Sequence, residues 1–210
     1  MNFIDYTLFT LGNGQPVLLM DLVSSILGIV CVFLAGRNSK YNFWVGYLYT
    51  ISLFLLFLHR NLYASLMLQP VSLLINVYGH FRWTHPAPEE ESISDQNALK
   101  VTMLTWPMRI LMIAGVFILA AAWGWILNAL FTGDPHPYLD SCVTVMILAA
   151  QLLSAMKKWD CWIAWIIVNI AQLALHLSVG NIFMPIVCAL YLINAIWSLV
   201  TWIKLYKTER

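Results

Sequence analysis

The sequence predicts an all-α integral membrane protein with seven transmembrane helices in a 3+1+3 arrangement, in which one helix links two parallel three-helix repeats. The composition is 61% hydrophobic and only 10% charged. A soluble domain of this length could not bury so much apolar surface in one core. Several apolar runs approach the roughly 20 residues that a helix needs to cross the hydrocarbon. Two distant parts of the chain also match each other, which suggests that the fold contains a repeat.

The expected helices follow the apolar runs in order along the chain. Their ranges are 17–35, 41–58, 62–82, 104–130, 138–155, 162–179 and 181–203. The stretch from 85 to 100 contains Pro86, Pro88 and three consecutive glutamates, so we expect a solvated linker there. The whole chain therefore forms one transmembrane domain, without a second folded unit.

Basic residues gather on one side of the predicted spans. Of the eleven Lys and Arg residues, ten belong to this side, and Arg60 stands alone on the other. Cytoplasmic segments of membrane proteins carry the excess of Lys and Arg. The sequence therefore predicts an N-terminus outside the cell and a C-terminus inside.

The chain matches itself when it is shifted by 118 residues. The matches place Lys40 on Lys158, Trp44 on Trp162, Leu55 on Leu173, and Leu74-Ile75-Asn76 on Leu192-Ile193-Asn194. The predicted repeats are 17–83 and 138–203, and 104–131 is the linker. Three helices plus one linking helix make the repeats parallel. In transporters built from repeats, the substrate site lies near the midplane between the units.

The 162–179 helix carries five aromatic or polar residues on one face. They are Trp162, Trp165, Asn169, Gln172 and His176, at spacings of three and four residues. Polar groups are expensive in lipid, so this face is expected to meet a cavity or another helix. A binding wall would use the indoles for stacking and the amides for hydrogen bonds. The alternative is a helix interface held together by amides.

The neighbouring helices offer further candidates for the same cavity. They are Gln69 and Asn76 in the 62–82 helix, Tyr191 and Asn194 in the 181–203 helix, and Tyr47 and Thr50 in the 41–58 helix. Asn76 and Asn194 are equivalent at the 118-residue offset. They can approach one cavity from opposite sides, or each can bind backbone within its own unit. Both alternatives stay open at this point.

Several motifs of this chain resemble the PnuC family of bacterial vitamin transporters. The motifs are Trp162-x-x-Trp165-x-x-x-Asn169, Tyr191-Leu-Ile-Asn194-Ala-Ile-Trp197, Leu62-Tyr63-Ala64, Leu68-Gln69 and Tyr78-Gly79, and the resemblance extends from about Tyr41 onward. It implies a SWEET-like fold, a homotrimer in the bacterial inner membrane, and facilitated diffusion of nicotinamide riboside. It also implies that a cytoplasmic kinase traps the riboside by phosphorylation, as a step toward NAD biosynthesis.

Within this resemblance, Trp165 provides a stacking surface and Asn169 a hydrogen-bonding partner for the substrate. Gln69, Asn76 and Asn194 are assigned by position to the ribose hydroxyls or the carboxamide. Related branches of the family carry thiamine or riboflavin, so these substrates remain alternatives. A membrane scaffold or interaction subunit is an alternative from a different class, and it predicts a filled interior.

The sequence shows no motif for an enzyme, a cofactor or a metal. It contains no GxxxxGK[ST] loop, no HExxH helix and no GxSxG elbow. Asp21 and Asp140 lie near the outer ends of their helices, so no carboxylate is placed for proton coupling within the membrane. We therefore expect a passive transporter that is not an enzyme and that holds no cofactor or metal.

Overall fold

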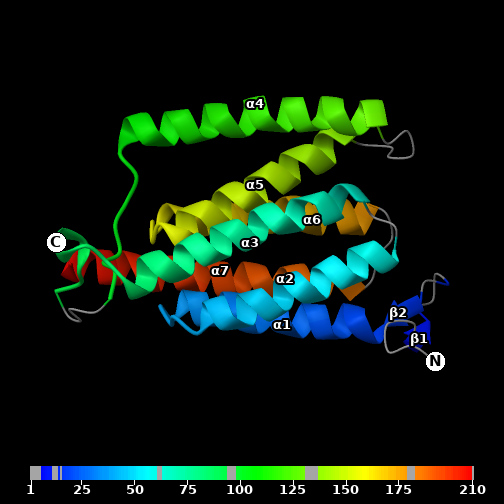
Figure 1. Cartoon of the computed structure of the whole chain (residues 1–210), viewed down its shortest axis with the longest axis horizontal. Coiled ribbons are helices and arrows are strands. Elements are labelled where there is room, and N and C mark those ends of the chain that lie inside the picture. Colours follow the sequence, from blue (N-terminus) through cyan, green and yellow to red (C-terminus); the bar gives the residue numbers. More distant parts are fainter. Residues whose placement is uncertain are drawn as a thin grey trace.

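Seven long helices make up most of the described chain (Figure 1). The computed structural model describes residues 6–10, 14, 16–60, 63–93, 98–130, 137–178 and 183–209. The helices are α1 (Leu19–Gly36), α2 (Asn42–His59), α3 (Tyr63–Thr84), α4 (Trp106–Leu130), α5 (Pro137–Ala155), α6 (Asp160–Ser178) and α7 (Phe183–Thr208). Two antiparallel strands, β1 (Thr7–Thr10) and β2 (Pro16–Leu18), precede α1, and a 3-10 turn, η2 (Pro88–Glu90), follows α3.

The helix ends differ by a few residues from the expected ranges. Residues 17 and 18 belong to β2, and α1 begins at Leu19 because the Asp21 carboxylate accepts the Leu18 backbone N–H at 2.9 Å. At the other end, α7 continues to Thr208, beyond the expected residue 203. The expected boundaries at 62, 131, 179 and 181 fall outside the described residues.

Five of the seven helices are long and apolar enough to cross a membrane. They are α1, α2, α4, most of α5 and most of α7. The other two are also long: α3 has 22 residues and α6 has 19, which correspond to roughly 33 and 28 Å. Their polar side chains lower their mean hydropathy, and several of these face the interior described below. The described chain is therefore a multi-pass membrane protein.

Six of the helices form a closed ring. Neighbours in this ring pack in the order α1, α2, α3, α5, α6, α7 and back to α1. α4 lies outside the ring and packs mainly against α5 (Figure 1). The ring order stays the same when the first three helices are exchanged for the last three, that is, α1 for α5, α2 for α6 and α3 for α7. The ring thus has the connectivity of a two-fold arrangement, with α4 as the connection between its halves.

Specific ring contacts recur between the two halves at an offset of 119 residues. Phe43 and Trp83 meet edge to face at 5.1 Å, and Trp162 and Trp202 meet in the same way at 5.4 Å. This register differs by one residue from the 118-residue offset of the sequence matches. Apolar helices draw on few residue types and match by chance at neighbouring offsets, whereas contacts select one register.

The ends of α1 and α5 also follow the 119-residue register. Two residues after the last residue of each helix comes a residue of positive φ, Asn38 at 61° and Lys157 at 56°. In both, the next N–H donates five residues back, from Ser39 to Leu34 and from Lys158 to Leu153. This is the Schellman pattern that usually requires glycine.

The last part of the α3–α4 connection, from Leu99 to Thr102, packs against the α5–α6 turn, whereas most described residues between 85 and 93 are at least partly exposed, as expected for a solvated linker. The Lys157 side chain is only 2% exposed, donates to the Leu99 carbonyl, and lies over the Trp83 ring at 4.7 Å. Thr102 pairs with the turn through hydrogen bonds at 3.1 and 3.0 Å. Burial lowers the pKa of Lys158 in the same turn, and the nearby Glu90 carboxylate opposes this effect. These contacts hold Lys157 in its unusual backbone conformation.

Asp160 joins the beginning of α6 to the beginning of α4. Its carboxylate accepts the Leu104 backbone N–H at 2.8 Å and pairs with Arg109 at 2.7 Å. The side chain is 10% exposed, so water cannot replace these partners fully. Asp160 also lies in the first turn of α6, where the helix dipole favours a negative charge.

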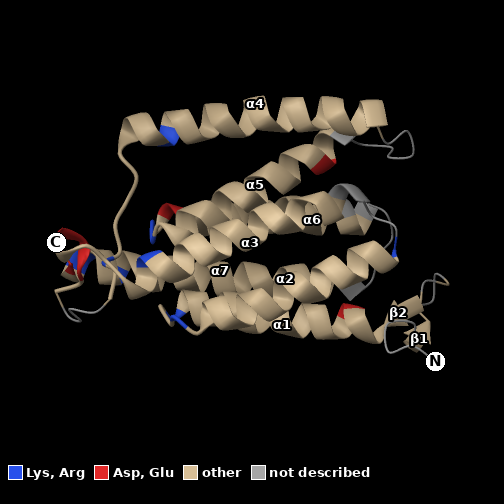
Figure 2. Cartoon of the chain, in the orientation of Figure 1, with Lys and Arg blue, Asp and Glu red and all other residues tan. Residues whose placement is uncertain are grey.

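Charged residues divide between the two ends of the bundle (Figure 2). Lys and Arg gather at the end that carries the α3–α4 connection and the C-terminus. Arg60 follows the last residue of α2, and the α2–α3 turn lies at the opposite end of the bundle (Figure 1). Asp21 pairs with Arg60, and Asp140 lies in the first turn of α5, away from the α5–α6 turn. Arg210, which belongs to the predicted basic side, lies outside the described residues.

Asp160→Ala should lower the free energy of unfolding by about 2–4 kcal/mol, because it leaves the Arg109 guanidinium and the Leu104 N–H without their buried acceptor. The melting temperature of the purified protein in detergent measures this loss. Glu89→Ala is the control, since Glu89 is exposed and no described hydrogen bond uses its carboxylate. Equal melting temperatures for both variants would contradict a structural role for Asp160.

Candidate functional site

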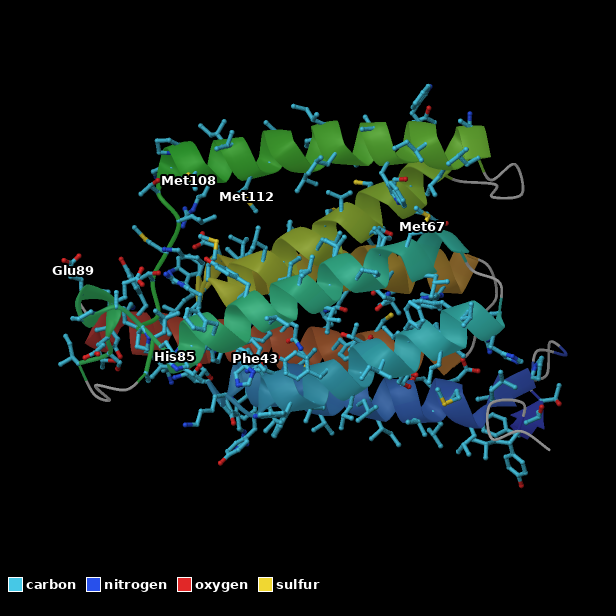
Figure 3. The ribbon with its side chains drawn as sticks, viewed as in Figure 1. Phe43, Met67, His85, Glu89, Met108 and Met112 are labelled. Atoms are coloured by element: carbon cyan, nitrogen blue, oxygen red, sulfur yellow. The ribbon has the colours of Figure 1, made fainter. Side chains whose placement is uncertain are left out.

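A cavity of about 1280 Å³ lies inside the ring. Every ring helix contributes to its lining, and Trp123, Leu127 and Leu130 of α4 complete one side. Asp21 and Arg60 line one end, and Arg60 is 38% exposed there. Phe43 and Trp162 line the other end, and both are buried. Phe43 lies in the half of the bundle that also carries His85 and Glu89 (Figure 3).

The aromatic and polar face of α6 forms one wall of this cavity. All five of its predicted residues, Trp162, Trp165, Asn169, Gln172 and His176, line the space. Asn169 is only 3% exposed, and neither Asn169 nor Gln172 takes part in a hydrogen bond within the described chain. The buried Trp162 indole N–H also lacks a partner there. The α6 wall therefore presents polar groups whose hydrogen-bonding capacity is unused.

The polar groups on α2 and α3 line the same cavity but already have partners. The Thr50 hydroxyl donates to the Gly46 carbonyl at 2.9 Å, and the Gln69 amide donates to the Ser65 carbonyl at 3.2 Å. The Asn76 amide donates to the Phe43 carbonyl at 3.2 Å. These side chains keep only part of their capacity for a ligand, in contrast to those of α6.

Tyr47 and Asn194 do not line the cavity, although both were predicted as site residues. Tyr47 shares a hydrogen bond of 2.9 Å with His80 Nδ1 on the α2–α3 face. Asn194 donates to the Val32 carbonyl at 3.2 Å and so joins α7 to α1, and its buried Oδ1 has no partner in the described chain. Asn76 and Asn194 therefore have different surroundings, as the 119-residue register requires.

Tyr191 and Tyr49 form a hydroxyl-bearing part of the lining next to α1. Both side chains line the cavity, and both lie against Gly28. Gly28 of α1 makes room for them, because a Cβ atom there would lie 2.2 Å from the Tyr191 hydroxyl and 3.1 Å from the Tyr49 ring. Sequence reasoning identified Tyr191 but missed Tyr49 and Gly28.

Gln151 of α5 is another lining residue that sequence reasoning missed. The Ser72 hydroxyl donates to Gln151 Oε1 at 2.9 Å, so α3 and α5 meet through a polar pair beside the cavity. A lone glutamine in the apolar 138–155 run is a usable signal, since polar side chains in a span rarely face lipid.

Charged side chains lie toward the exposed end of the cavity. Arg60 and Asp21 form an ion pair at 2.5 Å, and Asp140 also lines this part of the cavity. The lining near Trp165 and Asn169 consists of aromatic, amide, hydroxyl and apolar groups. Such a surface suits a flat, polar molecule that can stack on aromatic rings and form hydrogen bonds.

The fold and the cavity define a multi-pass α-helical membrane protein with a central space large enough for a small molecule. The family model for the nicotinamide mononucleotide transporter matches residues 18–204. This match covers most of the chain, so the protein belongs to that family, and the predicted resemblance to PnuC proteins is confirmed.

Three known proteins illustrate the relationship. The nicotinamide riboside transporter PnuC of Escherichia coli (strain K12) is 24% identical over 80% of this chain and 78% of its own length. The riboflavin/roseoflavin transporter RibM of Streptomyces davaonensis is 27% identical over 96% and 92%. The crystal structure of the vitamin B3 transporter PnuC superposes with a TM-score of 0.72 at 22% identity, covering 91% of this chain and 83% of that one. The structural match shows a shared fold.

Gly28→Ala should destabilise the protein by about 1–3 kcal/mol, because the added methyl overlaps the Tyr191 hydroxyl and crowds Tyr49. Gly115→Ala on α4 is the matched control, since a Cβ atom there meets nothing within 4 Å. Alanine is the better helix former by roughly 1 kcal/mol at both positions, so the difference between the two melting temperatures isolates packing. A Gly28→Ala variant as stable as Gly115→Ala would show that the tyrosines move aside freely.

Proposed function

We propose that this protein carries nicotinamide riboside across the membrane by facilitated diffusion. The observation that supports this most is the α6 wall, where the unpaired amides of Asn169 and Gln172 lie on the same cavity face as Trp165. Trp165 stacks on the pyridinium ring, and Asn169 hydrogen-bonds its substituents. Gln69, Asn76 and Tyr191 serve the ribose hydroxyls or the carboxamide from the other walls.

The chemistry of the wall agrees with a cationic ring. An indole face attracts such a ring by a cation-π interaction worth roughly 2 kcal/mol or more where water is excluded. A buried carboxylate could also attract it, but that carboxylate would cost free energy whenever the site is empty. Asp140 and the Asp21–Arg60 ion pair lie instead toward the exposed end of the cavity.

Riboflavin is the principal alternative substrate, and RibM supports it because that relative aligns over 96% of this chain. Riboflavin is also flat and rich in hydroxyl groups. Thiamine is a flat cation without a ribose, so the amide-rich wall favours it less. A scaffold role has less support, since it predicts a filled interior and the ring encloses a cavity of about 1280 Å³.

The transport cycle follows from two parallel units that rearrange around one site. We place the units at α1–α3 and α5–α7, with α4 as the linker, the N-terminus outside and the C-terminus inside. A homotrimer in the bacterial inner membrane is the assembly that the family resemblance supports. Phosphorylation by a cytoplasmic kinase keeps the riboside inside and supplies NAD biosynthesis, so the carrier needs no energy source of its own.

Calorimetric titration of the purified protein with nicotinamide riboside, riboflavin and thiamine tests the substrate. We expect saturable binding of the riboside, weakened on the order of tenfold or more by Trp165→Ala because the stacking surface is lost. Trp125→Ala is the control, since that indole is 66% exposed on α4 and does not line the cavity. Binding of riboflavin alone would replace the substrate, and binding of none of the three would remove this proposal.

Reporter fusions test the orientation. A green fluorescent protein fused to the C-terminus should fluoresce, because the basic end of the bundle lies in the cytoplasm. Alkaline phosphatase fused after Arg60 should be active, because that turn lies outside. The reverse pattern would invert the proposed topology.

A further inference from the structure

The cavity ends at a cluster of large buried rings. Phe43 and Trp162 form its floor, and Trp83 and Trp202 lie directly behind them in the same apolar cluster. Each of the four side chains is at most 4% exposed. The floor lies at the end of the bundle where the basic residues gather (Figures 2 and 3). A small molecule cannot leave the cavity at this end unless these rings separate.

The four rings form two equivalent pairs. In each pair, a ring of the floor meets a tryptophan edge to face, at 89° for Phe43 and Trp83 and at 84° for Trp162 and Trp202. The pairs are related by the 119-residue register. The floor therefore consists of two equivalent halves, one from α2 and α3 and the other from α6 and α7.

Both tryptophans donate a hydrogen bond to the opposite half of the ring. Trp83 on α3 donates to the Ala155 carbonyl at the end of α5, at 3.2 Å, and shares this N–H with the Ser154 carbonyl at 3.3 Å. Trp202 on α7 donates to the Gly36 carbonyl at the end of α1, at 3.1 Å. Gly36 and Ala155 are also separated by 119 residues. The two bonds are thus equivalent, and each joins one three-helix unit to the other.

Close packing accompanies both bonds. A Cβ atom at Gly79 would lie 2.8 Å from the Ala155 side chain, and one at Gly36 would lie 3.1 Å from the Ser198 Cβ. α3 and α5 therefore approach each other closely at one side of the floor, as α7 and α1 do at the other. In this conformation, the two units are therefore in close contact on both sides of the floor.

We propose that Trp83 and Trp202 are the gate residues of this end, and that the site opens toward the basic side when both indole hydrogen bonds break. The inference rests on the proposed function, because only a carrier needs to open here. The rings of Phe43 and Trp162 then separate as the units move, and each indole loses its carbonyl acceptor. Trp83 and Trp202 hold the closed state and do not touch the substrate.

Replacing each gate tryptophan by phenylalanine removes the N–H and keeps an aromatic ring. Trp83→Phe and Trp202→Phe are made in a chain where Cys161 is the sole cysteine, after Cys31, Cys142 and Cys188 are changed to serine. Cys161 is fully buried in the floor cluster, so its alkylation by N-ethylmaleimide reports opening. Trp159→Phe is the matched control, since its indole N–H is also buried at this end but has no partner in the described chain.

We expect each gate variant to accelerate alkylation of Cys161 by about fivefold, the effect of one hydrogen bond on an opening equilibrium. Trp159→Phe should leave the rate unchanged. The proposal is overturned if the gate variants react as slowly as Trp159→Phe, or if Trp159→Phe reacts as fast as they do. This assay uses no substrate, so it is independent of whether nicotinamide riboside is carried.

A second variant tests the same gate in the opposite direction. Gly36→Cys with Ser198→Cys, in a chain without other cysteines, places two Cβ atoms 3.1 Å apart where α1 meets α7, slightly closer than the roughly 3.5–4.5 Å usual in a disulfide. Oxidation should hold the floor closed and abolish riboside uptake into cells, and a reductant should restore it. Full uptake by the oxidised protein would overturn the proposal. Absent uptake in the reduced protein as well would count against the substrate instead.

Discussion

The cost of an unsatisfied polar group in hydrocarbon governs this structure. A soluble protein can leave an amide at its surface, but a membrane span must pair that amide with protein or turn it toward a polar space. The chain meets this requirement in two ways. Thr50 and Gln69 bond to carbonyls one turn back on their own helices, whereas Asn169 and Gln172 face the cavity. The ring closes around these groups and leaves its outer surface apolar.

The two halves of the ring meet the same constraint with different residues. In the 119-residue register, Thr50 on α2 corresponds to Asn169 on α6, and Gly46 corresponds to Trp165. At these positions, the α2 side of the cavity thus carries small side chains, and its Thr50 hydroxyl is bonded within the helix. The α6 side carries large side chains, and its Asn169 amide has no hydrogen-bond partner in the described chain. A two-fold arrangement of helices thereby encloses a cavity with two chemically different walls.

Charged side chains are buried at the α5–α6 turn, at one end of the bundle. Lys157 is almost completely buried in the α5–α6 turn, where a carbonyl and an indole ring surround its ammonium group. Asp160 ties α6 to α4 beside it. These contacts stiffen the end of the bundle where the cavity floor lies. The α3–α4 connection therefore contributes to structure as well as linking the two units.

Much of the helical pattern could be predicted because its causes are local. Apolar runs of suitable length set the spans, and the spacing of Trp165, Asn169 and Gln172 placed them on one face. The strand pair before α1 and the packing of the α3–α4 connection escaped prediction. Both depend on partners distant in sequence, such as Leu99 and Lys157, which no local pattern brings together.

The sequence by itself determined the class of the protein, the approximate position of each helix and the polar face of α6. Only the tertiary structure decided the register between the halves, the exclusion of Tyr47 and Asn194 from the cavity, and the place of Tyr49 beside Gly28. Helix formation and lipid exposure follow from neighbours along the chain. Which side chains share one cavity depends on how separate helices pack, and a single residue of register changes that outcome.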